Sequence, residues 1–152
     1  MKIYFFGVAA VLAIAAIGCG SGGSSTESGL TKAQFIKRGD AICHTARRRK
    51  TEALKAWTEA PANKGKTFED WSTAELEHVY LTVALPPVKQ ASQELADLTP
   101  PTGDVKAEEI VKSLAATVGA LEENPRAALK GAPYYHTDKL AQAYGFKACG
   151  FL

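Results

Sequence analysis

The hydrophobic positions of the chain predict helices, each with one apolar side. From Leu30 onward, apolar residues recur at steps of three and four, the period of a helix that buries one face. The first helix is expected from about Lys32 to Thr58, with Thr31 and Gln34 forming a capping box and Pro61 marking its end. Its apolar side comprises Ile36, Gly39, Ile42, Cys43, Ala46, Ala53, Leu54 and Trp57.

A second helix is expected to open at Thr67, where the acids that follow favour the positive end of the helix dipole. Pro86-Pro87 removes two backbone donors, so this helix is expected to break or kink near Leu85 before its pattern resumes to Leu98. Its buried residues are expected to be Phe68, Trp71, Leu76, Val79, Tyr80, Val83, Val88, Ala91, Leu95 and Leu98.

Two more helical segments complete the expected fold. Asp104 is suited to cap a third helix, whose apolar side comprises Ala107, Ile110, Val111, Leu114, Val118 and Leu121. A short helix follows Asn124-Pro125, and Thr137 is expected to cap a last helix that Gly145 ends in a left-handed conformation. With no useful strand pattern, residues 30–152 are predicted to be all-α, an antiparallel bundle of about four main helices.

The first 29 residues read as an export signal and a tether. Met1-Lys2 precedes an apolar run of roughly 15 residues, which suits a signal peptide better than a membrane span of about 20. Ala16-Ile17-Gly18-Cys19 resembles the lipobox of bacterial lipoproteins, which implies a signal peptide over 1–18 and acyl chains on Cys19. Residues 19–29 form a Gly/Ser-rich tether. The alternative is an ordinary secretory signal with an incidental cysteine. The lipoprotein interpretation places the protein on the outer face of the plasma membrane, bound to the bilayer through Cys19.

Two cysteines remain once Cys19 is lipidated. Cys43 lies on the apolar side of the first helix, and Cys149 follows the last one. Outside the reducing cytosol such a pair is expected to form a disulfide that closes the bundle. The alternative is a reactive or metal-binding pair, but two thiols without a nearby histidine motif make a poor zinc site.

Three short motifs resemble a known group of proteins. They are Asp40-Ala41-Ile42-Cys43 in the first helix, Leu98-Thr99-Pro100-Pro101 at mid-chain, and a tail from Tyr144-Gly145 to Cys149-Gly150. The chain thereby resembles small helical lipoproteins of actinobacterial type that have no characterised function. The resemblance implies the helical fold and the disulfide, and it assigns no activity. The basic run Arg47-Arg48-Arg49-Lys50 departs from that group.

The net charge and the sequence motifs argue against several classes of function. Removing residues 1–18 takes away Lys2 and leaves 17 basic against 16 acidic residues, so nucleic-acid binding is not expected. Glu75-x-x-His78 has no second copy to complete a di-iron site, and a solvated helix face is the better interpretation. Asp40 and His44 are expected to pair locally at the surface. The sequence predicts no metal, cofactor or catalytic residue, and therefore no enzyme.

Three hypotheses follow. The first is a membrane-anchored interaction or structural module of the cell envelope, without enzymatic activity and with an envelope protein as its partner. The alternative is a small-ligand binder with a pocket near the Pro86-Pro87 kink, for which Trp57, Trp71 and Tyr80 are the speculative ligand-binding residues. The third is a hydrolase or metal enzyme, which would need perturbed ionisable groups gathered in a cleft. A structure with His44, His78 and His136 far apart and solvated would exclude it. The run 47–50 either lies along the apolar stripe with its charges in solvent, or contacts anionic lipid or an acidic partner.

Overall fold

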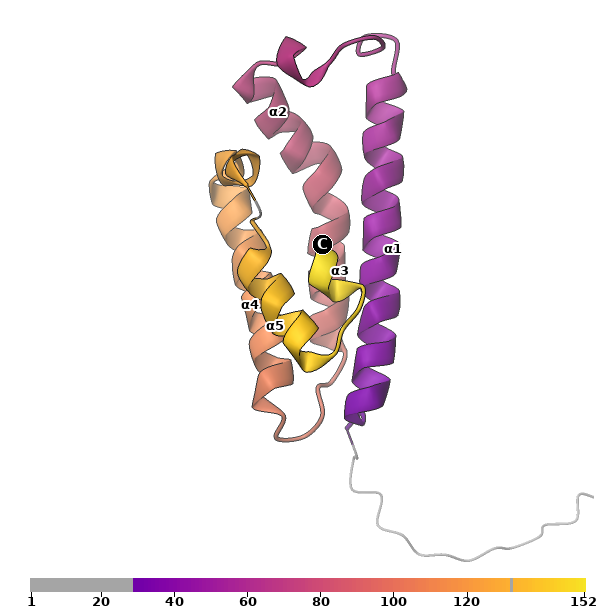
Figure 1. The fold of residues 1–152 in the computed structure, drawn as a ribbon, viewed down its shortest axis with the longest axis vertical. Coiled ribbons are helices and arrows are strands. Elements are labelled where there is room, and N and C mark those ends of the chain that lie inside the picture. The colour runs from indigo at the N-terminus through magenta and orange to yellow at the C-terminus, as the bar shows by residue number, and fades with distance from the viewer. Residues whose placement is uncertain (1–28, 132) are drawn as a thin grey trace, which may run out of the picture.

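The computed structural model describes residues 29–131 and 133–152, and this part of the chain is an antiparallel bundle of helices without strands (Figure 1). The predicted all-α fold is confirmed. The α-helices are α1 (Lys32–Glu59), α2 (Thr73–Val79), α3 (Leu85–Asp97), α4 (Val105–Glu123) and α5 (Tyr135–Tyr144). Helix α1 packs on α3, α3 on α4 and α4 on α5.

Helix α1 starts where its capping signals predict. The Thr31 hydroxyl accepts a hydrogen bond from the Gln34 backbone N–H at 3.3 Å. The Gln34 side-chain oxygen in turn accepts one from the Thr31 N–H at 2.9 Å. The helix ends at Glu59, one residue beyond the expected Thr58. The capping box, whose two residues lie within one helical turn of each other, therefore sets the start of α1.

The second helix starts later than predicted. Thr67 caps only a short 3-10 turn, Phe68–Asp70, and Trp71 is extended after it. A second capping box, formed by Ser72 and Glu75, then starts α2. Phe68 is 67% exposed, so its expected place in the core was wrong. Two capping signals compete in this segment, and the later one starts the α-helix.

The α-helical geometry is interrupted just before Leu85, as expected, but the helical segment does not end there. The five residues before α3, Tyr80–Ala84, form a π-helical turn, in which the Leu85 N–H donates to the Tyr80 carbonyl. This widened turn absorbs the missing proline donors and the ring clash that α-helical geometry would impose. Helices α2 and α3 therefore follow one another as a continuous helical segment.

The last two helices show one confirmed cap and one wrong one. The Asp104 side chain accepts from the Ala107 N–H at 3.2 Å and starts α4 as predicted. Thr137 does not cap α5, which begins at Tyr135. Its hydroxyl is buried and lies 2.7 Å from the Ser113 hydroxyl of α4. Gly145 ends α5 at φ 119°, the left-handed conformation expected there.

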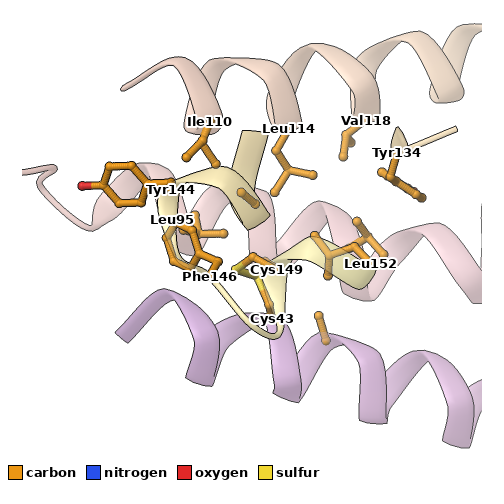
Figure 2. Close-up of a cluster of buried hydrophobic side chains, with 14 of the residues drawn as sticks. Cys43, Leu95, Ile110, Leu114, Val118, Tyr134, Tyr144, Phe146, Cys149 and Leu152 are labelled. Carbon is orange, nitrogen blue, oxygen red and sulfur yellow. A yellow bond between two sulfur atoms is a disulfide. The ribbon is translucent and has the colours of Figure 1, made fainter. Parts of the chain in front are cut away.

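The core lies between α1, α3, α4 and α5, and the tail after α5 turns back into it. Figure 2 shows Phe146, Cys149 and Leu152 of this tail between the helices. The buried residues include Phe35, Cys43, Leu85, Val88, Leu95, Ile110, Leu114, Val118, Leu121, Tyr144, Phe146, Cys149 and Leu152. None of the helices in the described ranges combines the length and hydropathy of a membrane span.

Candidate functional site

The tail is fastened to α1 by a disulfide. Cys43 and Cys149 are bonded at 2.02 Å with their Cα atoms 5.1 Å apart, and they are 106 residues apart in sequence. Both are buried, at 0% and 2% exposure, in the middle of the core cluster (Figure 2). The predicted disulfide is confirmed. Its two sulfur atoms are bonded to each other, which leaves no thiol for the metal-binding alternative.

Asp40 fastens the same tail by hydrogen bonds. Its carboxylate accepts the backbone N–H of Lys147 at 3.0 Å, of Ala148 at 2.7 Å and of Cys149 at 3.3 Å. The expected local pairing of Asp40 with His44 is therefore wrong. A carboxylate is a strong acceptor for N–H groups. Asp40 therefore holds the backbone of three consecutive residues in the segment that follows α5.

Aromatic rings fill the space beside this attachment. Phe146 lies against Phe35, with ring centroids 5.7 Å apart, and against Gly39, where an added Cβ would lie 2.6 Å from the ring. The Tyr144 hydroxyl donates to Asp104 at 2.6 Å. This bond lowers the pKa of Asp104, while burial and the bond raise the pKa of Tyr144. The aromatic residues thus connect the tail to α1 and to the start of α4.

A second polar cluster surrounds Leu152. The Lys50 ammonium of α1 donates to the Leu152 carbonyl oxygen. Burial and the nearby Arg47 lower the pKa of Lys50. Burial raises the pKa of Asp138 on α5, one of whose oxygens has no hydrogen-bond partner in the described part of the chain. Through its hydrogen bond to Leu152, Lys50 helps to attach the tail to α1.

The two tryptophans meet at the end of the bundle near the loop after α1. Trp57 and Trp71 have ring centroids 4.4 Å apart. Together with Asn63, Ala74, Glu75, His78 and Val79 they line a cavity of about 310 Å³. The Asn63 side chain donates to the Trp57 carbonyl at 2.7 Å, which holds the loop against the end of α1. Lys66 lies 4.2 Å over the Trp71 ring.

Two parts of the expected ligand site, Tyr80 and the Pro86-Pro87 kink, do not belong to this cavity. Tyr80 does not line this cavity: its hydroxyl lies 2.7 Å from that of Tyr134, and burial raises the pKa of both tyrosines. At the prolines, Leu85 and Val88 on either side of them are 2% and 1% exposed, so within the described residues packed side chains fill the place of the expected pocket. The widened turn keeps these side chains packed in the core.

The candidate catalytic residues are not brought together. Glu75 is occupied in the capping box of α2, where bonds from Ser72 lower its pKa. His44, His78 and His136 are exposed and line three different hollows of the surface. Within residues 29–131 and 133–152, no three metal-ligating side chains of His, Cys, Asp or Glu form a cluster.

The basic run divides between several partners. Arg48 pairs with Glu52 at 2.9 Å, Arg49 donates to Gln90 at 2.9 Å, and Lys50 holds Leu152. The remaining residue, Arg47, is exposed and lines an open hollow of about 420 Å³ with His44, Arg48, Thr51 and Glu52. Both expectations for this run stay open, although only Lys50 points into the bundle.

Cys19, the expected lipid attachment, lies outside the described residues. Comparison with protein-family models, with curated proteins and with solved structures found no significant match to this chain.

Proposed function

We propose that this protein is a lipoprotein of the cell envelope, anchored through Cys19 on the outer face of the plasma membrane, and that its bundle acts by binding a partner. The observation that carries the proposal is the buried Cys43–Cys149 disulfide. Disulfides of this kind persist in oxidising compartments and are rare in the cytosol. Together with the signal-like segment 1–18 and Cys19, it supports export followed by anchoring.

The dispersal of reactive groups supports binding over catalysis. Catalytic groups work when they converge on one point within hydrogen-bond reach. Here the histidines line separate hollows, and the carboxylates of Asp40 and Glu75 hold backbone amides. These two carboxylates therefore stabilise the fold.

Fractionation of cells that express the full chain tests the anchor. Cys19→Ser should move the protein from the membrane to the soluble fraction, because the acyl chains are its attachment. Cys149→Ala is the matched control: it removes a different cysteine and should leave the protein in the membrane fraction. Membrane retention of the Cys19→Ser protein would refute the anchor.

A second candidate function is the binding of a small, mainly apolar ligand in the cavity that Trp57 and Trp71 help to line. The favouring observation is the cavity of about 310 Å³ that the two indole rings line. Ligand pockets of proteins start at about 300 Å³ and are lined mainly by apolar and aromatic side chains. The site therefore suits a compact molecule with a flat or apolar part.

Native mass spectrometry of the full protein, extracted from membranes, tests this second function. A ligand should appear as an added mass that Trp71→Ala removes. Phe68→Ala is the control, because that ring is nearby in sequence, lies outside the cavity and is 67% exposed. A bare protein mass in every preparation, or an added mass that Trp71→Ala leaves unchanged, would refute the tryptophan site.

A further inference from the structure

The cations of this protein are concentrated in the first part of α1. From Lys32 to Lys50 the helix carries seven lysines and arginines and a single acid, Asp40. The rest of the chain then has eleven basic and fifteen acidic residues. The near-neutral total therefore conceals one positive segment on an otherwise acidic protein.

Part of this charge forms one exposed surface, which we call the basic face. It consists of Lys37, His44, Arg47, Arg48 and Lys147, all exposed. Positions 37, 44 and 48 follow one another at steps of seven and four, so they share one side of the helix. That side is turned away from the buried positions of α1, which are Phe35, Gly39, Cys43 and Ala46.

The tail completes the basic face and occupies the acid beside it. The Lys147 N–H binds Asp40, which places this residue one helical turn from His44. The Asp40 carboxylate accepts three tail amides and is directed to them. Glu52, at the other end of the face, is paired with Arg48. The face therefore keeps a net positive charge toward solvent.

We propose that the basic face of α1 lies on the anionic lipid headgroups of the membrane that anchors the protein. This inference rests on the lipid anchor proposed above. The described chain begins at Gly29, ten positions after Cys19 in the sequence, and α1 starts at Lys32. The charge is thus concentrated in the part of α1 nearest to that anchor.

Proximity and charge then act together. The electrostatic surface potential of an anionic bilayer falls off within a Debye length of about 8–10 Å, so only charges held near the bilayer respond to it. The anchor supplies that proximity as a high effective concentration. The anchor brings the bilayer close to the charged part of α1, so anionic lipid suits the basic face. A soluble acidic protein would not require the charge to lie in the part of α1 nearest to the anchor.

This docking would orient the whole bundle. Helix α1 would lie along the bilayer surface, with α3 above it. Helix α4 packs on α3 and α5, on the side of the bundle away from α1 (Figure 1). The open hollow of about 870 Å³ along α4, which Val105, Ala116 and Ala120 help to line, would face away from the membrane.

The experiment measures the orientation of the full lipidated protein in vesicles. A fluorophore is attached through Ala41→Cys beside the basic face or, as the matched position, through Ala116→Cys on α4; both positions are exposed. Vesicles contain phosphatidylcholine alone or mixed with phosphatidylglycerol, together with a lipid that carries a quencher at its headgroup. Quenching at position 41 should rise with phosphatidylglycerol and fall with added salt, and quenching at position 116 should not.

Charge removal gives the second comparison. Lys37→Gln or Arg47→Gln should each lower the ratio of docked to undocked protein about fivefold, the effect of roughly 1 kcal/mol per cation near an anionic surface. Lys106→Gln and Lys112→Gln on α4 are the controls and should leave the ratio unchanged. Equal quenching at position 41 in both kinds of vesicle would overturn lipid docking.

The anchor and the docking fail in different ways. Only the anchor determines whether the protein floats with vesicles of either composition, so a protein that does not float refutes the anchor. Quenching is measured on the floating fraction alone. A protein that floats with both vesicles but shows no dependence on lipid charge refutes the docking and leaves the anchor standing.

Discussion

Removal of the Cys43–Cys149 disulfide should cost this fold a large part of its stability. The bond joins residues 106 apart in sequence. In the chain-entropy model, closing a loop of that length lowers the entropy of the unfolded chain, which stabilises the fold by about 4.8 kcal/mol. A domain of this kind has a total stability of about 5–15 kcal/mol, so the bond accounts for a large fraction of it.

Urea unfolding measures this loss, with the unanchored Cys19→Ser protein as the reference. Cys43→Ala, Cys149→Ala and the double variant should lose similar amounts, within the range of about 2–5 kcal/mol found for native disulfides of small secreted domains. The three losses should match because either change alone breaks the same bond, so the single effects cannot add. Losses below about 1 kcal/mol, or a double variant whose loss is the sum of the singles, would refute this reasoning.

Three other predictions concern the tail and its contacts. Asp40→Ala removes the acceptor for three amides and should cost about 2–3 kcal/mol, with faster hydrogen exchange of the tail amides and unchanged exchange in α4; slow exchange in the tail would contradict the Asp40 attachment. Gly39→Ala should destabilise by about 1–3 kcal/mol through its clash with Phe146, whereas Gly119→Ala, whose Cβ meets nothing within 4 Å, should stabilise by up to about 1 kcal/mol; thermal unfolding that ranks them the other way refutes the packing. Tyr144→Phe removes the hydrogen bond that lowers the pKa of Asp104. Because the pKa of this carboxyl is lower in the folded state, its ionised form stabilises the fold above the unfolded pKa of about 3.9. This stability is lost as pH falls through the lowered folded pKa. The difference in Tm between Tyr144→Phe and the wild type should therefore shrink below about pH 3.9, and a constant difference would contradict the linkage.

The sequence predicted best where a signal and its target lie within one helical turn. Thr31 with Gln34, Asp104 with Ala107, and the left-handed Gly145 each act on neighbouring backbone groups, so their effect does not depend on the rest of the fold. The disulfide was predictable for a different reason. Once Cys19 was set aside, only one pair of cysteines remained, and the compartment favoured their oxidation.

The errors fall where local signals compete or where tertiary packing takes over a residue. Thr67 and Ser72 both satisfy a capping box, and periodicity alone does not say which one starts the α-helix. Thr137 looked like a cap, but its hydroxyl is buried against Ser113. Pro86-Pro87 was expected to interrupt the bundle, since the sequence does not show that a π-helical turn can absorb the missing donors.

By itself, the sequence determined the fold class, most helix positions and the bond that closes the bundle, because these depend on periodicity, capping and cysteine number. Only the tertiary structure decided the roles of Asp40, Lys50 and Tyr80. Asp40 meets its amide partners up to 109 residues away, Lys50 meets Leu152 102 residues away, and Tyr80 pairs with Tyr134 across 54 residues. A side chain can reach such partners only after the helices have packed, so no pattern of near neighbours encodes them.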